Sequence, residues 1–276
     1  MSVGSVGSIA VSVIPPSRIL LVGASGYLAG VVGDVLHRAG YHVRGFDRVA
    51  PPANHPLDEF VVGDITRHDD VRRAMDGQDA VVQLVALVRG RHEQPLERFI
   101  DVMVKGAWFV ADAAAEAGIT RLVTISSIVA IGTPRPVDRP LVEEDLAVMG
   151  GPDLYYQLSK WLGEEIGRAY GQARGLSIVH LRPGVIAGDG VNPGPALPEP
   201  PRRYWFNYVD PRDVAQAVQG ALHSTSVRQS SYFLVADHPQ TAYDIGPAKR
   251  DLGYAPAHNW LNLRSPVADL DQHEQP

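Results

Sequence analysis

Near the start of the chain lies Ile19-Leu20-Leu21-Val22-Gly23-Ala24-Ser25-Gly26, and this run determines the architecture of the residues after it. A short apolar run is typical of a strand buried on both faces of a parallel sheet. Here it leads through a glycine-rich turn into a helical pattern, which is the context that dinucleotide binding requires. Gly23 permits the tight turn, Gly26 lets the backbone approach a pyrophosphate, and the first N–H groups of the helix hold the phosphates. Tight turns without a ligand use the same residues, so the turn alone leaves both interpretations open.

The next predicted strand, residues 42–46, ends in Asp47 and Arg48. An acid about 20 residues after the glycine turn accepts hydrogen bonds from a ribose. Because its carboxylate repels a 2′-phosphate, Asp47 favours NAD over NADP, although the adjacent Arg48 weakens that preference. The other interpretation is an ordinary exposed Asp-Arg pair at the end of a strand.

Strands and helices alternate along the rest of the chain. Strands are predicted at residues 59–62, 80–85, 122–125, 176–181, 202–209 and 232–235, and helices at 71–75, 96–117, 153–173, 213–222 and 244–252. Alternation without hairpin signals predicts an α/β fold, a Rossmann-type doubly wound parallel sheet with a small C-terminal substrate-binding appendage. We expect a flexible leader (1–17), an NAD-binding domain with the catalytic residues (18–187), a small substrate-binding region interleaved with it (188–263) and a flexible tail (264–276).

Composition limits the class of protein. The 276 residues are 45% hydrophobic and 20% charged, which suits one large α/β domain. A net charge of −6 without long runs of like charge indicates no nucleic-acid partner. No stretch approaches the roughly 18 uncharged apolar residues of a membrane span. The absence of cysteine excludes disulfides and thiolate metal sites, and we expect no metal site and a cytoplasmic location.

Tyr156 and Lys160 are four residues apart in a stretch without Gly or Pro, so on a helix they share one face. A phenol titrates near pH ~10 and is a poor base at neutral pH. A neighbouring ammonium stabilises the phenolate and lowers its pKa, which makes the tyrosine a usable general acid/base. With ten tyrosines in the chain, chance also produces such a pair, so the pair gains meaning only from a site around it.

Further short motifs occur in a fixed order. They are Gly63-Asp64-Ile65, Ile125-Ser126-Ser127 with Gly132, Tyr156-Gln157-Leu158-Ser159-Lys160, and Leu181-Arg182-Pro183-Gly184. Together with the glycine turn and Asp47, they make residues 18–260 resemble the extended short-chain dehydrogenase/reductase family, also called the NAD-dependent epimerase/dehydratase family. That resemblance implies a Rossmann fold, NAD as the cofactor and a hydride transfer at a carbon bearing oxygen.

The resemblance also implies the roles of individual residues. Tyr156 is the acid/base, Lys160 lowers its pKa and binds the nicotinamide ribose, and Ser127 polarises the substrate oxygen. The implied cofactor-binding residues are Gly23, Ser25, Gly26, Tyr27, Leu28, Asp47, Arg48, Asp64, Ile65, Leu84, Val85, Ala86, Lys160, Pro183 and Val185. The implied substrate-binding residues are Val88, Arg89, Ile128 and Arg203. Arg89, with Arg91 and His92, follows a predicted strand and suits an anionic substrate, but a solvated loop has the same composition.

The chain departs from the family pattern at three positions. Met103 stands where many relatives have an Asn, which puts any proton relay or helix distortion that uses the Asn in doubt. Gln83 replaces a common His, and Ala29 replaces the third glycine of the turn. The region after Gly184 is also shorter than in sugar-nucleotide epimerases, which favours a small substrate.

In size the chain is most similar to uronate dehydrogenases, which oxidise a free sugar acid to a lactone. Arg203 matches the arginine that pairs the substrate carboxylate there, although a surface arginine explains it equally well. The Asn-His pair of those enzymes is Ile128-Val129 here, so the pocket is more apolar. We therefore expect an NAD-dependent oxidoreductase acting on a small hydroxy or keto compound of the sugar or sugar-acid class. The alternatives are a sugar-nucleotide epimerase or dehydratase and a non-enzymatic NAD(P)-binding sensor. We expect a homodimer paired through the helices at 96–117 and 153–173.

Overall fold

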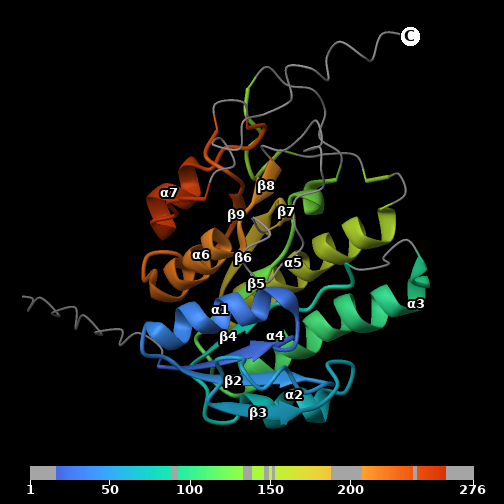
Figure 1. The fold of residues 1–276 in the computed structure, drawn as a ribbon. Helices are drawn as coiled ribbons and strands as arrows, with labels where there is room; N and C mark the ends of the chain where they lie inside the picture. The colour runs from blue at the N-terminus through green and yellow to red at the C-terminus, as the bar shows by residue number, and fades with distance from the viewer. Residues whose placement is uncertain are drawn as a thin grey trace, which may run out of the picture.

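The computed structural model describes residues 17–88, 93–132, 139–145, 149–150, 153–187, 207–238 and 241–258. Seven strands in this part of the chain form one sheet in the order β3-β2-β1-β4-β5-β6-β9 (Figure 1). They are β1 (Arg18–Val22), β2 (His42–Asp47), β3 (Glu59–Val62), β4 (Ala80–Gln83), β5 (Arg121–Ile125), β6 (Ser177–Pro183) and β9 (Gln229–Leu234). All six neighbouring pairs in this sheet are parallel, so the predicted doubly wound parallel sheet is confirmed.

Helices cover both faces of this sheet. The helices α1 (Tyr27–Arg38) and α6 (Pro211–His223) pack against each other on one face, and α2 (His68–Met75), α4 (Gly106–Glu116) and α5 (Leu154–Arg174) cover the other (Figure 1). Successive strand residues point to opposite faces, so Ile19 and Leu21 join the core under α1 and α6. Leu20 and Val22 join the second core, with residues of α2 and α4. The continuous apolar run of β1 is explained by burial on both sides.

The order of connection reverses between β1 and β4. From β1 the chain moves outward through β2 to β3, and it then returns to β4 on the other side and continues to β5, β6 and β9. In open parallel sheets, ligands bind beside the carboxyl ends of the strands at such a reversal. The fold therefore places the most favourable binding crevice next to Gly23, which follows β1, and Leu84, which follows β4.

The predicted helix at 96–117 is not uniform. It consists of α3 (Leu96–Arg98), the π-helix η2 (Phe99–Lys105) and α4, so the expectation of one regular α-helix is wrong over residues 99–105. A π-helix widens the turn, because its hydrogen bonds join residues five apart. Met103 lies inside this segment with 5% of its surface exposed. The family pattern has an Asn at position 103, and its replacement by Met103 put the helix distortion in doubt. The distortion is present all the same, as the π-helix η2.

The C-terminal elements are built onto the end of the sheet. The short strands β7 (Val185–Ile186) and β8 (Tyr208–Val209) pair in parallel, and α7 (Gly246–Leu252) packs against α6 and β9. A Cβ atom on Gly184 would lie 1.8 Å from the carbonyl oxygen of Asn207, so this junction accepts only glycine. Sequence reasoning missed the 3₁₀ helix η3 (Ile128–Ile131) after β5.

Some expectations concern residues outside the described ranges. These are the leader except Ser17, the tail at 264–276 and the whole of the stretch 188–206. Among the described helices, none combines the length and apolar composition needed to cross a bilayer.

Candidate active site

The glycine turn closes directly against the next strand at the reversal point. Gly23 has a φ of +90°, and a Cβ atom there would lie 2.9 Å from the Val85 side chain. Its N–H donates to the carbonyl oxygen of Phe46 at 2.9 Å, which ties the turn to β2. Gly26 then precedes α1, whose first residues are Tyr27 and Leu28. The turn therefore has no side chains at the two glycines where a pyrophosphate would approach the backbone. This geometry fits a dinucleotide.

Asp47 lies beside this turn. Its Oδ2 accepts a hydrogen bond from the backbone N–H of Ser25 at 3.1 Å, and its Oδ1 accepts one from Arg48 N–H at 2.7 Å. The Ser25 hydroxyl donates to the carbonyl oxygen of Val49. Two segments about 20 residues apart in sequence are thus joined, and the carboxylate lies where it could meet a ribose next to the phosphates.

Other residues predicted to bind the cofactor surround this pair. Arg48 Nη1 lies 4.0 Å from the Asp64 carboxylate. Asp64 Oδ1 accepts from Thr66 N–H at 2.9 Å, which fixes the turn after β3. Ile65 is buried, and a Cβ atom on Gly106 would come within 3.0 Å of it. Leu84, Val85 and Ala86 follow β4 and are half-buried. The structure brings these predicted residues to one edge of the sheet.

Ser127 lies at the neighbouring strand end, two residues after β5. Its hydroxyl oxygen accepts the backbone N–H of Val129 at 3.3 Å and so caps η3. Ile128, predicted to contact substrate, is 9% exposed and packs in the core beneath α6. Pro183 ends β6, and Val185 opens β7 with 52% of its surface exposed.

Tyr156 and Lys160 lie on α5, as predicted, with the Lys160 Nζ 5.7 Å from the centroid of the Tyr156 ring. Lys160 is 6% exposed, and its ammonium donates to the carbonyl oxygen of Ile125 at 2.6 Å. Burial lowers the pKa of Lys160 to about 8, against an opposing effect of the Glu164 carboxylate. The lysine is therefore held between the tyrosine and the strand that leads to Ser127.

Glu164 is the site residue that sequence reasoning missed. Arg182 donates to both of its oxygens, with Nε to Oε1 at 3.0 Å and Nη2 to Oε2 at 2.7 Å. The Ser126 hydroxyl also donates to Oε1, and the Ser231 hydroxyl donates to Oε2 at 3.2 Å. The available signal was spacing, because Tyr156, Lys160 and Glu164 follow one another at intervals of four along one face of α5.

A cavity of about 40 Å³ lies behind Lys160, between α5, β5 and the π-helix. Its polar lining residues are Gln83, Thr124, Ser126, Ser159, Lys160 and Glu164, and its apolar side includes Met103. A polar space of this size accommodates a water molecule. An open groove of about 560 Å³ lies on the other side of Glu164, lined by parts of α5, β6, β9 and α7.

Two predicted substrate contacts cannot be compared with the structure. Arg89 and Arg203 lie outside the described residues, as do Arg91 and His92. Val88, the described neighbour of Arg89, is 48% exposed.

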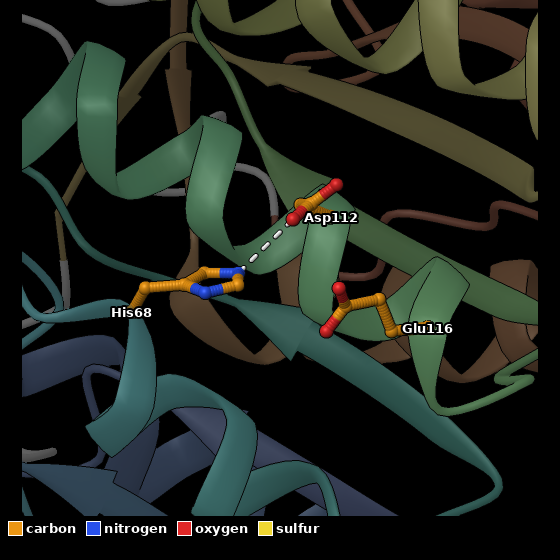
Figure 2. Close-up of side chains that lie close together, drawn as sticks. All are labelled: His68, Asp112 and Glu116. Atoms are coloured by element: carbon orange, nitrogen blue, oxygen red, sulfur yellow. Dashed lines mark ion pairs between the residues drawn. The ribbon is translucent and has the colours of Figure 1, made fainter.

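One group of possible metal ligands occurs among the described residues. Figure 2 shows His68, at the start of α2, pointing toward Asp112 and Glu116 on α4, with ligand atoms within 4.8 Å of one another. His68 Nε2 lies 3.1 Å from Asp112, which also accepts the Tyr170 hydroxyl at 2.7 Å. Glu116 already pairs with Arg72 at 3.0 Å. The ion pairs of His68 and Glu116 link α2 with α4, and the hydrogen bond from Tyr170 links α4 with α5.

Comparisons of the sequence with known proteins found a matching family model and several relatives. The model of the NAD dependent epimerase/dehydratase family matches residues 19–205. The chain is 34% identical to the protein y4nG of Sinorhizobium fredii over 62% of this chain, a match that spans 41% of that protein. It is 28% identical to a uronate dehydrogenase of Pseudomonas syringae over 92% of this chain and 86% of that enzyme.

Two solved structures extend the comparison to the fold. Uronate dehydrogenase from Agrobacterium tumefaciens superposes with a TM-score of 0.74 at 22% identity, covering 94% of this chain and 90% of that one. MoeE5, solved with UDP-glucose and NAD, gives a TM-score of 0.71 at 20% identity, covering 88% of this chain and 94% of that one. At these identities the structural likeness concerns the fold alone.

Proposed function

Because the chain belongs to the NAD-dependent epimerase/dehydratase family, an extended branch of the short-chain dehydrogenases/reductases, we propose that it is an NAD-dependent oxidoreductase. Its substrate is a small hydroxy or keto compound, and we favour a sugar or sugar acid. A hydride passes between the substrate carbon and the nicotinamide, and Tyr156 handles the accompanying proton.

The observation that carries the proposal is the convergence of two half-sites at one edge of the sheet. The glycine turn at Gly23 follows β1, and Asp47 is the last residue of β2. Ser127 follows β5, and Lys160 joins this strand end to Tyr156 through its bond to Ile125. A cofactor held by the first half would therefore face the acid/base held by the second.

The chemistry follows from these side chains. In the oxidising direction, the Tyr156 phenolate takes the proton of the substrate hydroxyl, and the Ser127 hydroxyl donates a hydrogen bond to the same oxygen. The Lys160 ammonium stabilises the phenolate and so lowers the pKa of the tyrosine. NAD, when bound, supplies the hydride acceptor. In the reducing direction the same tyrosine returns the proton to the carbonyl oxygen.

The proposed substrate class rests on the relatives and on predicted contacts. The Pseudomonas syringae relative, matched along 92% of this chain, is a uronate dehydrogenase. Arg203 and Arg89 are the proposed partners of a substrate carboxylate, and guanidinium groups suit that planar anion. Ile128 and Val88 would make the pocket more apolar, so uronate itself is one candidate among sugar acids.

One assay tests the proposed reaction. Purified protein is incubated with NAD and, in separate wells, free sugars, sugar acids and sugar nucleotides, while the absorbance of reduced nicotinamide is followed. We expect steady formation of reduced cofactor with a free sugar or sugar acid. Conversion of a sugar nucleotide without net reduced cofactor would favour an epimerase or dehydratase instead, and NAD binding without turnover of any compound would favour a sensor.

Replacing Tyr156 by Phe tests its role as acid/base. The substitution keeps the ring but removes the hydroxyl, so we expect turnover to fall by at least about a hundredfold, the scale of general acid–base catalysis. Binding of reduced NAD, followed by its fluorescence, should stay within about twofold. Tyr155→Phe, on the adjacent and more exposed ring, is the matched control. Full activity of Tyr156→Phe would refute the mechanism.

We also propose that the protein is a homodimer paired through α4 and α5. Large apolar side chains are exposed along these helices, including Trp108 at 55% and Trp161 at 42%. Trp161→Glu should convert a dimer into a monomer in light scattering, because it buries a charge in the apolar contact. Val62→Glu, at a position on β3 that is 62% exposed, should leave the mass unchanged. A wild-type monomer at micromolar concentration would contradict the proposal.

The cytoplasmic location stays a prediction from composition.

A further inference from the structure

A single buried carboxylate joins the segments that carry the proposed catalytic residues. We propose that Glu164 is the positioning residue of this site, holding the strand ends beside Ser127 and Pro183 and acting as the counter-charge of the Lys160 ammonium. The inference rests on the proposed function, because it assigns Lys160 a charge that the reaction uses.

The carboxylate of Glu164 accepts four hydrogen bonds from three side chains. Arg182 binds both oxygens in a fork, and the hydroxyls of Ser126 and Ser231 each donate to one oxygen. The side chains of Arg182 and Glu164 are 9% and 8% exposed. Burial alone would raise the pKa of Glu164, but the hydrogen bonds of Arg182 hold it below its ordinary value. Glu164 therefore stays ionised across the neutral range.

Two of these partners, Ser126 and Arg182, are sequence neighbours of proposed catalytic and cofactor residues. Ser126 directly precedes Ser127 after β5, and Arg182 directly precedes Pro183 at the end of β6. A bidentate Arg–carboxylate pair fixes orientation as well as distance. One side chain on α5 therefore sets the position of two neighbouring strand ends relative to the helix that carries Tyr156.

The same carboxylate affects the charge of Lys160. Among the described residues that line the small cavity behind Lys160, Glu164 is the one acid, one helical turn away. The lining residues from β4, β5 and the π-helix, such as Gln83, Thr124 and Met103, are uncharged. From β6, the charged Arg182 guanidinium binds the Glu164 oxygens and does not line the cavity, and burial lowers the pKa of His180, which keeps that ring neutral. The Lys160 ammonium also lies near the ring of Tyr156, whose phenolate it stabilises in the proposed reaction.

Burial and the Glu164 charge shift the pKa of Lys160 in opposite directions. Burial lowers the pKa of Lys160 to about 8 although Glu164 opposes the shift. At pH 7 a lysine with that pKa is roughly ten parts ammonium to one part amine. Without the opposing charge, the amine form would become comparable with the ammonium at neutral pH. A neutral amine would no longer stabilise the Tyr156 phenolate by its charge.

The lysine content of the chain makes a direct measurement possible. Lysine occurs at three positions, Lys105, Lys160 and Lys249. Protein labelled with ¹³C at the lysine ε carbon should give three signals, of which Lys160 is the one lost in Lys160→Arg. Lys105 and Lys249, which pair with Asp101 and Asp237 and are about two-fifths exposed, serve as internal references. The titration needs neither cofactor nor substrate.

The test compares two neighbouring substitutions on α5. In Glu164→Gln we expect the titration midpoint of Lys160 to fall by about one pH unit, a tenfold change in its acid dissociation constant. Glu165→Gln removes the same charge one residue along, where the side chain is 36% exposed and paired with Arg168, and should leave the midpoint unchanged. A purely structural role of Glu164 would not produce this difference between the two variants.

Glu164→Gln leaves the buried Arg182 guanidinium without its partner, so folding is checked first by circular dichroism. If that variant is unfolded, the titration is made on the double variant Glu164→Gln with Arg182→Gln, which leaves neither charge unpaired. The midpoint of Lys160 should still fall, because Arg182 does not line its cavity. An unchanged midpoint in a folded variant, or an equal fall in Glu165→Gln, would overturn the proposal. A failed substrate assay would leave this result standing, so the two tests fail separately.

Discussion

At the scale of single residues, the ribose end of the site depends on one carboxylate. Both oxygens of Asp47 already accept backbone N–H groups from Ser25 and Arg48, so the side chain is oriented before any ligand binds. An oriented acceptor loses little entropy when it binds a hydroxyl. The position of Asp47 therefore supports a preference for the cofactor that carries a free 2′-hydroxyl.

We predict that Asp47→Asn lowers the preference for NADH over NADPH by about tenfold. The substitution keeps the shape of the side chain but removes the charge that repels a 2′-phosphate and strengthens the hydrogen bond to the ribose. Fluorescence titration with both reduced cofactors measures the ratio. Asp34→Asn, on the exposed side of α1, should leave it unchanged. Equal affinities of the wild-type protein for the two cofactors would contradict the role of Asp47.

At this scale, a site residue can be predicted from the sequence when the residues that define its role are close to it along the chain. Gly23, Tyr156 and Lys160 were predictable because a turn and a helical spacing are local patterns. The contacts of Glu164 were not, because Ser126 and Arg182 meet it only after two strands and a helix have packed. Arg89 and Arg203 remain predictions that the described residues do not test.

At the scale of elements, α5 packs on the sheet through glycines of unequal importance. A Cβ atom on Gly167 would lie 2.6 Å from the His180 ring, which is held in place by Thr124 at 2.6 Å. On Gly163, one turn earlier, the nearest atom to a Cβ would be that of Ala107 at 3.8 Å. The helix is therefore close-packed at one glycine and has room at the other.

We predict opposite effects of alanine at these two positions. Gly167→Ala should lower the free energy of unfolding by about 1–3 kcal/mol, because the buried imidazole cannot move aside. Gly163→Ala should leave it unchanged or raise it by up to about 1 kcal/mol, since alanine is the better helix former. Urea unfolding measures both. Equal stability of the two variants would show that the His180 contact relaxes freely.

Element boundaries show where sequence patterns fail. The period of residues 96–117 is helical throughout, so nothing in it distinguishes a π-helix from an α-helix over Phe99–Lys105. The 3₁₀ helix Ile128–Ile131 forms because Ser127 caps it, and four residues are too few for a periodic signal. The long α5, by contrast, has a clear pattern and ends at Gly175 with a φ of +71°, as expected for a glycine cap.

At the scale of the whole molecule, the sheet was predictable because most of its strands are short apolar runs separated by helical patterns. Crossover connections between parallel strands allow few strand orders. In the observed order, the direction of connection reverses beside the glycine turn. Sequence patterns do not report how the C-terminal elements close over this sheet. That closure depends on contacts such as Tyr243 against Phe233, whose ring centroids are 4.9 Å apart.

The buried phenol of Tyr243 makes the stability of the fold depend on pH in the alkaline range. Burial raises the pKa of Tyr243 to about 12, from about 10 in an unfolded chain. The folded state therefore keeps its proton where the unfolded state has lost it, and the stability that this proton represents is complete below pH ~10 and is lost as the pH rises toward ~12. A shift of two units corresponds to roughly 3 kcal/mol.

We expect urea unfolding free energies to fall between pH 10 and pH 12, with a smaller fall in Tyr243→Phe, which has no phenol to titrate at this position. Tyr155→Phe removes a tyrosine that is 46% exposed and should leave the slope as in the wild type. A slope that Tyr243→Phe does not change would show that other groups control alkaline unfolding.

The pairing of β7 with β8 has a consequence for how this scaffold can change. Val185 lies opposite Tyr208, and Ala187 N–H donates to the carbonyl oxygen of Val209 at 3.1 Å. The chain before residue 188 and the chain after residue 206 are thus anchored side by side, whatever lies between them. Doubling the length of a segment with fixed ends costs only about 0.6 kcal/mol of closure entropy. This junction is therefore a natural exchange point, at which a segment taken from a relative could be grafted to alter substrate preference while Tyr156, Lys160 and Ser127 keep their positions.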